Sequence, residues 1–182
     1  MIATFGDTEF KNDASAFGSR LRLADGPLEL NWHHCSVTSE FIGDFFALKR
    51  GAAGADYNEA HHSIGYLVNE LLENAVKFRL PGEVLVESTL EDGCFEVKVT
   101  NMIDEATSER FSALLEEITS CDPGELLIQR IEANAEDASS SGSGLGLLTL
   151  MSDYGARLGW RFSSPAAGQP VRLETFAALD LA

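Results

Sequence analysis

Two residue types in one helix-forming stretch have the spacing needed to act together. Glu70 and Asn74 stand four residues apart in the segment NELLENAVKF, residues 69–78. Side chains four apart lie above one another on a helix, so the carboxylate and the carboxamide point at one spot. An amide oxygen suits Mg²⁺, and a carboxylate can orient or deprotonate an attacking hydroxyl or water. The spacing predicts a site for a Mg²⁺-bound phosphate, with a solvated helix face as the alternative.

A glycine-rich run follows much later, in the segment SGSGLGLLTL, residues 141–150. It opens directly into an apolar, helix-forming stretch, and such a junction offers an anion free backbone N–H groups and the positive end of a helix dipole. Glycine inside a helix costs roughly 1 kcal/mol, which is reasonable where the backbone must approach a ligand closely. The residues expected to hold phosphate are Gly142, Ser143, Gly144, Leu145 and Gly146.

This run is neither of two common phosphate-binding loops. The dinucleotide fingerprint requires glycine where Leu147 stands, and a Walker A loop requires a Gly-Lys-Ser/Thr sequence that does not follow. A flexible surface loop is therefore the alternative interpretation. Lys77 lies near the predicted metal site, and a phosphate contact and a surface role are equally compatible with its position. In the surface role it would pair with Glu73.

The bulk composition limits the possible partners. The 182 residues, 45% hydrophobic and 23% charged, are typical of a single globular domain. A formal net charge of −16 argues against binding nucleic acid or an anionic membrane surface, because both repel an acidic protein. An acidic protein also needs a cation to bring in a triphosphate. ATP together with Mg²⁺ is the expected ligand.

The sequence also favours a cytoplasmic location. The first twenty residues carry charges and no apolar leader, and no later run is long enough to span a bilayer. The three cysteines are odd in number and match no metal-ligand spacing, so we expect reduced thiols.

Residues 1–50 are expected to form an arm, a hairpin and a helix. The arm covers residues 1–19, and the hairpin pairs residues 21–23 with residues 28–32 across Ala24-Asp25-Gly26-Pro27. A helix capped by Ser36 or Thr38 then continues to Leu48. Its inward-facing side chains are predicted to be Phe41, Ile42, Phe45 and Phe46. The hairpin and helix together are a candidate homodimer surface.

The rest of the chain alternates between helical and strand patterns. A helix is predicted at 56–78, followed by strands at 84–90 and 95–101 that a turn at Glu91-Asp92-Gly93 joins into a hairpin. Residues 102–143 become polar, with short helices at 109–118 and 124–135, and are expected to form a lid over the nucleotide. A helix at 145–154 and strands at 158–163 and 171–177 complete the chain. Trp32 and Trp160 are both placed in strands, as core residues. No linker is visible, so residues 1–182 are predicted to be one domain.

The two motifs together resemble those of the GHKL superfamily of ATPases, which includes histidine-kinase ATP-binding domains, gyrase B and anti-sigma-factor kinases. The family's N box matches Glu70-x-x-x-Asn74-Ala75-x-Lys77-Phe78, and its second glycine box matches residues 142–147. The resemblance covers residues 57–176. It implies an α/β two-layer sandwich of the Bergerat type, with a mixed, mainly antiparallel sheet and helices on one face. It also implies ATP between the helices and the lid, with Asn74 on Mg²⁺ and Glu70 as the base.

One position departs from that family. Its members usually follow the second strand of the hairpin with Asp-x-Gly-x-Gly, whose Asp accepts a hydrogen bond from the adenine amine. Here Asn101 stands in place of the Asp, and both glycines are missing. An asparagine oxygen can still accept that bond, so the resemblance implies that Asn101 contacts the base. The adenine end of the pocket is nevertheless altered.

A closer resemblance is to the SiaB type of stand-alone bacterial kinase. It rests on the segment LGLLTLMSDYGA, residues 145–156, the following LGW, residues 158–160, and the short N-terminal elements. This group is similar to anti-sigma-factor kinases, and the resemblance implies transfer of phosphate from ATP to a Ser or Thr of a small regulatory protein in a partner-switching pathway. Two alternatives remain: a catalytically inactive nucleotide-binding module that sequesters its partner, and simple ATP hydrolysis.

Overall fold

A computed structural model describes residues 2–9, 18–24, 30–49, 55–136 and 144–181. Within these ranges six strands form one sheet in the order β1-β5-β6-β4-β3-β2. Every neighbouring pair is antiparallel, so the sheet is not the mixed one that we expected. The strands are β1 (Ile2–Gly6), β2 (Ser19–Leu23), β3 (Val84–Glu91), β4 (Cys94–Ile103), β5 (Arg157–Ser163) and β6 (Val171–Asp180).

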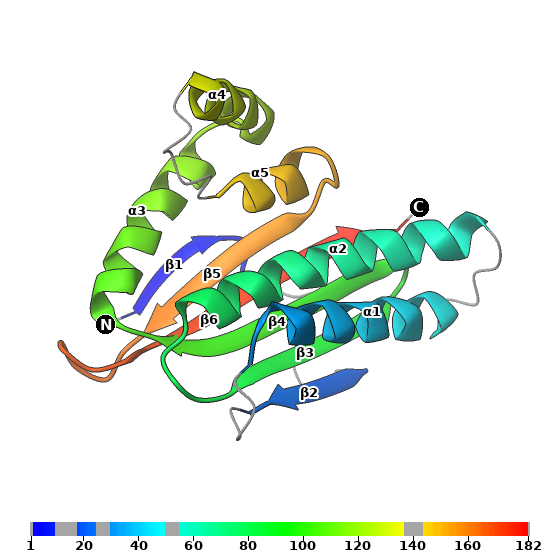
Figure 1. The fold of residues 1–182 in the computed structure, drawn as a ribbon, viewed down its shortest axis with the longest axis horizontal. Coiled ribbons are helices and arrows are strands. Elements are labelled where there is room, and N and C mark those ends of the chain that lie inside the picture. Colours follow the sequence, from blue (N-terminus) through cyan, green and yellow to red (C-terminus); the bar gives the residue numbers. More distant parts are fainter. Residues whose placement is uncertain (1, 10–17, 25–29, 50–54, 137–143, 182) are drawn as a thin grey trace.

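Helices cover one face of this sheet and give a two-layer α/β sandwich. In the described ranges they are α1 (Trp32–Lys49), α2 (Ala55–Phe78), α3 (Glu105–Ser120), α4 (Pro123–Glu136) and α5 (Leu145–Ser152). Figure 1 shows α1 and α2 side by side in front of the strands, with α3 near β1 and with α4 beyond α5. The fold class predicted from the sequence is confirmed at this level, as a mixed α/β fold with an antiparallel sheet.

The pleat of the sheet decides which side chains meet the helices. In β4 the odd-numbered residues face inward, and the register places Val99 opposite Thr175 and Asn101 opposite Leu173. Thr175 in turn pairs with Trp160 of β5. These residues consequently share the inner face of the sheet. Most of that face is apolar and fully buried, so Asn101 is a polar exception.

The long helix α2 is amphipathic, and its apolar side packs on the sheet. Ile64, Leu67, Val68 and Leu72 are fully buried and belong to the same hydrophobic cluster as the inner strands. On its flank α2 meets α1 at close range, because Gly43 of α1 has no side chain. A Cβ there would lie 2.9 Å from the His61 carbonyl oxygen. This tight pairing fixes the direction in which the residues of α2 project.

The N-terminal predictions were partly wrong. Residues 2–6 of the expected loose arm form β1, which pairs with β5 from Ile2↔Ser163 to Gly6↔Gly159. Residues 21–23 are in a strand, as predicted, and β2 pairs with β3. Of the predicted partner strand at residues 28–32, the described residues 30–32 are not in a strand. Residues 10–17 and 25–29 lie outside the described ranges. Short edge strands with one exposed face give little periodicity to read, which explains the error.

The first helix also begins earlier than predicted. It starts at Trp32, and the Asn31 side chain accepts a hydrogen bond from the His33 N–H (3.0 Å), so Asn31 caps the helix in place of Ser36 or Thr38. Trp32 is 63% exposed and is not a core residue of a strand. Of the four side chains predicted to face inward, Ile42 and Phe46 are buried, while Phe41 and Phe45 are exposed.

The predicted lid is built differently at its start. Residues 102 and 103 still belong to β4, and α3 begins at Glu105 with Asp104 as its cap. Leu115 and Ile118 of α3 are fully buried, so this helix is packed into the domain. Residues 137–143 of the predicted lid lie outside the described ranges. Among the described helices, none combines the length and the apolar character required to cross a bilayer.

Candidate functional site

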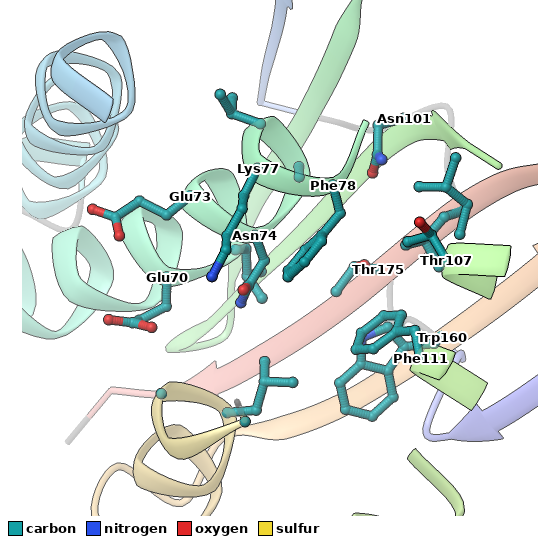
Figure 2. A pocket seen from close by; sticks show the side chains of 18 of the residues that line it. Glu70, Glu73, Asn74, Lys77, Phe78, Asn101, Thr107, Phe111, Trp160 and Thr175 are labelled. Atoms are coloured by element: carbon teal, nitrogen blue, oxygen red, sulfur yellow. The ribbon is translucent and has the colours of Figure 1, made fainter. Parts of the chain in front are cut away.

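A cavity of about 930 Å³ lies between α2, α3, α5 and the inner face of the sheet. Its floor includes Asn101, Trp160 and Thr175, and its walls come from the C-terminal half of α2 and from α3. Figure 2 shows Glu70, Asn74 and Lys77 along one side, with Asn101 at the far end. Most of the residues singled out from the sequence thus line a single cavity of a size suited to a small ligand.

The closest approach between the two predicted motifs joins α2 to α5. A Cβ built on Gly146 would lie 1.9 Å from Glu70 Oε2 and 2.8 Å from Glu70 Cδ. The carboxylate of Glu70 therefore rests against the bare backbone of α5, and a side chain at position 146 would have to push the end of Glu70 aside. Two sequence segments more than seventy residues apart meet at this point.

The N-terminus of α5 has the features expected of an anion site. Gly144 precedes the helix in a left-handed conformation, with φ 89°, which glycine adopts without strain. The first N–H groups of any α-helix have no intrahelical acceptor and carry the positive end of the dipole. Arg130 of α4 lies close by, because a Cβ on Gly144 would be 2.8 Å from its Nη1. Its Nη2 also donates to Glu117 Oε2 at 2.7 Å.

Asn74 and Lys77 lie on the same side of α2 as Glu70, facing the cavity (Figure 2). The predicted alternative of a Glu73–Lys77 surface pair is not what the structure has. Glu73 accepts a hydrogen bond from the Asn69 side chain at 2.8 Å, and the Lys77 ammonium lies 5.1 Å from the centroid of the Phe78 ring. Lys77 therefore contributes positive charge to the wall of the cavity.

Asn101, one of the site residues predicted from the sequence, lies in the floor of the cavity. It is 2% exposed, and neither Oδ1 nor Nδ2 has a hydrogen-bond partner among the described residues. Leaving such a group unpaired in the interior costs about 1–3 kcal/mol. The ring of Phe111 packs edge-on against Trp160, 6.2 Å between centroids, and both line the same cavity. A buried amide beside aromatic side chains is suited to a flat heterocycle that can both donate and accept hydrogen bonds.

Electrostatics favour Glu70 as a proton acceptor. Burial raises the pKa of the Glu70 carboxyl above its ordinary value, the charge of Glu73 raises it further, and a hydrogen bond from Tyr66 opposes both. A carboxylate with a raised pKa is a better base than an exposed one. Neighbouring Cys35 also lines the cavity, and burial raises the pKa of its thiol.

Not every predicted site residue is brought to the cavity. Leu145 packs against the hydrophobic core and is not among the lining residues. Its expected phosphate contact can therefore involve only its backbone N–H. Gly142 and Ser143 lie outside the described residues. Sequence reasoning missed Arg110, Arg130 and Tyr66, and only Tyr66, four residues before Glu70, had a spacing that pointed to the site.

The residues present fit a magnesium ion that arrives with a nucleotide. Within the described ranges, no group of three or more His, Cys, Asp or Glu side chains is placed to hold a metal. Mg²⁺ in nucleotide sites typically takes one or two protein oxygens and completes its octahedron with phosphates and water. The Asn74 amide oxygen, with the Glu70 carboxylate nearby, is such a donor set, and both side chains line the cavity.

Comparison with known proteins establishes the fold and no closer relationship. No protein-family model matches the chain, and no curated protein matches it either. A chain in the crystal structure of the SiaB–SiaC complex from Pseudomonas aeruginosa has a similar fold, with a TM-score of 0.57 and 11% sequence identity. The similarity covers 87% of this chain and 89% of that chain. The arrangement of sheet and helices described above is therefore shared with a protein of solved structure.

Proposed function

We propose that this protein binds ATP with Mg²⁺ and transfers the γ-phosphate to a Ser or Thr of a small regulatory protein. The observation that carries the proposal is the meeting of Glu70 with Gly146 in the lining of the cavity. It brings a base of raised pKa, an amide ligand for a metal and a glycine-bounded helix N-terminus around one space. Phosphoryl transfer needs little more than such positioning and charge neutralisation.

Each residue has a separate role in this proposal. The backbone N–H groups after Gly144 and the ammonium of Lys77 hold the phosphates, and the Asn74 oxygen holds Mg²⁺, which supplies positive charge to the β- and γ-phosphates. Glu70 accepts the proton of the acceptor hydroxyl. The hydroxyl oxygen then forms a bond to the γ-phosphorus, and the bond to the β–γ bridging oxygen breaks with its electron pair leaving on ADP.

The far end of the cavity is proposed to hold the nucleobase. Adenine offers an amino donor next to a ring-nitrogen acceptor, and a carboxamide can pair with both. Asn101 supplies such a carboxamide with both polar atoms unpaired among the described residues. Asn101, which replaces the usual Asp of the family motif, would then recognise the base directly. The aromatic pair of Phe111 and Trp160 supplies an apolar wall.

The partner is proposed from the fold comparison. The similar chain was solved in a complex named SiaB–SiaC. The resemblance of this sequence to the SiaB type also implied a role in partner switching with a small protein. We extend that role to this chain, acting in the cytoplasm. A homodimer through the N-terminal elements also stays a proposal.

The test measures ATP binding and phosphate transfer separately. Binding of Mg²⁺–ATP to the purified full chain is measured by calorimetry. Transfer of labelled γ-phosphate is measured separately, on the chain together with the proteins that co-purify with it. Glu70→Gln is expected to retain binding and to lose at least about a hundredfold in transfer rate, which is the scale of general-base catalysis. Glu59→Gln, the same change at an exposed position of α2, is the matched control.

The outcomes separate the candidate functions. Transfer to a Ser or Thr that depends on Glu70 supports the kinase. Binding of ATP without transfer, together with partner binding that ATP does not alter, would instead select the sequestering module. Release of inorganic phosphate without labelled protein would select simple hydrolysis, and no ATP binding at all would refute the whole proposal.

A further inference from the structure

Trp160 of β5 is fully buried, and its indole N–H has no hydrogen-bond partner among the described residues. A tryptophan side chain has one donor and no acceptor, and a buried one usually finds a partner for that donor. Burying a donor without an acceptor opposes folding, so such a group needs an explanation. Because Trp160 lines the cavity, a ligand there is one source of the acceptor.

The unmet hydrogen-bonding capacity at the cavity is concentrated in two side chains. Within the described part of the chain, Asn101 and Trp160 are the lining residues that have buried side-chain nitrogen or oxygen atoms without a partner. The atoms are Oδ1 and Nδ2 of Asn101 and Nε1 of Trp160. Together they offer a ligand two donors and one acceptor.

The sheet holds these two side chains on one face, two strands apart. Trp160 pairs with Thr175 of β6, and Thr175 pairs with Val99, two residues before Asn101 on β4. With strands about 4.8 Å apart and a rise of about 3.4 Å per residue, the backbones at the two positions are roughly 12 Å from each other. Both side chains belong to the floor of the cavity (Figure 2). A flat ligand of two fused rings between them can therefore meet both.

The ring of Phe111 packs on the indole in this structure. It lies edge-on to Trp160, with 6.2 Å between centroids, and also contacts Phe162, with 5.9 Å between centroids. Phe111 is partly buried and belongs to α3, whereas Trp160 is held in the sheet by its pairing with β6. We therefore expect the Phe111 ring to turn aside when a ligand reaches the indole N–H.

We propose that Trp160 is a second recognition residue for the base: its Nε1 donates a hydrogen bond to a ring nitrogen of adenine that Asn101 does not contact. The inference rests on the proposed binding of ATP and deepens it. Adenine presents its amino group between the acceptors N1 and N7, and a third acceptor, N3, on another edge. Asn101 pairs with the amino group and one adjacent ring nitrogen, which leaves two ring nitrogens as acceptors for the indole.

The experiment measures, by calorimetry on the full chain with Mg²⁺, the binding of three ATP analogues in which N1, N3 or N7 is replaced by C–H. In the unaltered protein, the analogue without the acceptor for Trp160 should bind about tenfold more weakly than ATP, the scale of one hydrogen bond. In Trp160→Phe, which keeps an aromatic ring without the N–H, that penalty should disappear. The penalty of the analogue that loses its bond to Asn101 should stay.

Trp32→Phe is the matched control. It makes the same change in the other tryptophan of the chain, which is 63% exposed on α1, and it should keep every penalty of the unaltered protein. A purely structural role of Trp160 would weaken ATP and all three analogues equally in Trp160→Phe. Penalties that do not change in that variant, or the absence of any penalty in the unaltered protein, would overturn the inference.

A second measurement leaves position 160 unaltered, in case Trp160→Phe does not fold because of the space that it opens in the core. The ¹⁵N-labelled chain has two indole N–H signals, and the one that remains in Trp32→Phe belongs to Trp160. Mg²⁺–ATP should move that signal downfield, as hydrogen bonding does, and one of the three analogues should bind without moving it. Equal movement with ATP and every analogue, or no movement with ATP bound, would overturn the inference.

The outcomes also separate this inference from the proposed function. If the penalty depends on Trp160 and no variant transfers phosphate, the kinase activity fails while the role of Trp160 stands. If phosphate is transferred and no penalty depends on Trp160, the inference alone fails. If ATP does not bind, both fail.

Discussion

Replacing Asn101 with leucine should have opposite effects on stability and on ATP binding. The side chain is 2% exposed with both polar atoms unpaired among the described residues, and leucine has a similar size without those atoms. Without nucleotide, this substitution should stabilise the fold by about 1 kcal/mol, because leucine has no polar atoms whose desolvation opposes folding. In a domain of this length the melting temperature should rise by roughly 2–4 °C.

The same substitution should weaken ATP. Two lost hydrogen bonds to the base, each worth about 0.5–1.5 kcal/mol net, amount to about 1–3 kcal/mol. That corresponds to roughly 5- to 150-fold in dissociation constant. Calorimetry with Mg²⁺–ATP measures the affinity, and thermal melting of the unliganded protein measures the stability. Asn101→Asp keeps an acceptor and loses the donor, so its affinity for ATP should lie between those of the unaltered protein and Asn101→Leu. Its buried charge should lower the stability of the fold.

An analogue of ATP without the 6-amino group sharpens the assay. It should bind the unaltered protein more weakly than ATP does, and the difference should shrink in Asn101→Leu, because the two changes remove the same hydrogen bond. The reasoning is refuted if Asn101→Leu melts at a lower temperature and binds ATP with unchanged affinity. Asn101 would then be a structural residue and the base would lie elsewhere.

Three further outcomes follow from other contacts. Gly146→Ala places a Cβ 1.9 Å from Glu70 Oε2, so ATP turnover measured by phosphate transfer should fall by at least about tenfold, and full activity would contradict the placement. Cys121 is exposed whereas Cys35 is buried with a raised thiol pKa, so mass spectrometry should find a thiol reagent on Cys121 first. Burial alone would raise the pKa of Glu87, yet its cationic partners hold it below its ordinary value. Glu87→Gln should therefore lower the free energy of unfolding at neutral pH. The difference from the unaltered protein, measured by denaturant titration, should disappear as the pH falls through the lowered pKa of Glu87.

Local signals predicted much of the central part of the chain. The helix that carries Glu70 and Asn74 was expected at residues 56–78 and is found at Ala55–Phe78. The strong turn signal between β3 and β4 is confirmed, with Asp92 at φ 50° and Gly93 at φ 77°. In both cases the determining information lies within a few residues: a 3.6-residue period in one and left-handed turn residues in the other.

The parts that failed depend on distant contacts. The strand at residues 2–6 exists because β5 offers it an edge, and no property of those five residues required it. Trp32 was assigned to the core because it ended the predicted strand at residues 28–32, but it lies at the start of α1 and is exposed. Strand propensity is weak evidence when the packing partner is unknown.

The candidate site divides in the same way. The pair of Glu70 and Asn74 could be read from its spacing, because residues four apart on a helix are neighbours whatever the tertiary fold. The approach of Arg130 to Gly144 and the contact of Glu70 with Gly146 could not, since each joins different parts of the chain. Periodicity gives the direction of a side chain but not what it meets.

The pairing of β1 with β5 has a consequence for how the chain folds. The register pairs Ile2 with Ser163, so the edge strand β1 lies beside a strand that is about 160 residues later in the sequence. Loop closure over such a separation is entropically costly and slow, and a ribosome releases the first partner long before the second. We therefore expect the hairpin of β3 and β4 and the helices that cover it to assemble before β1 pairs with β5.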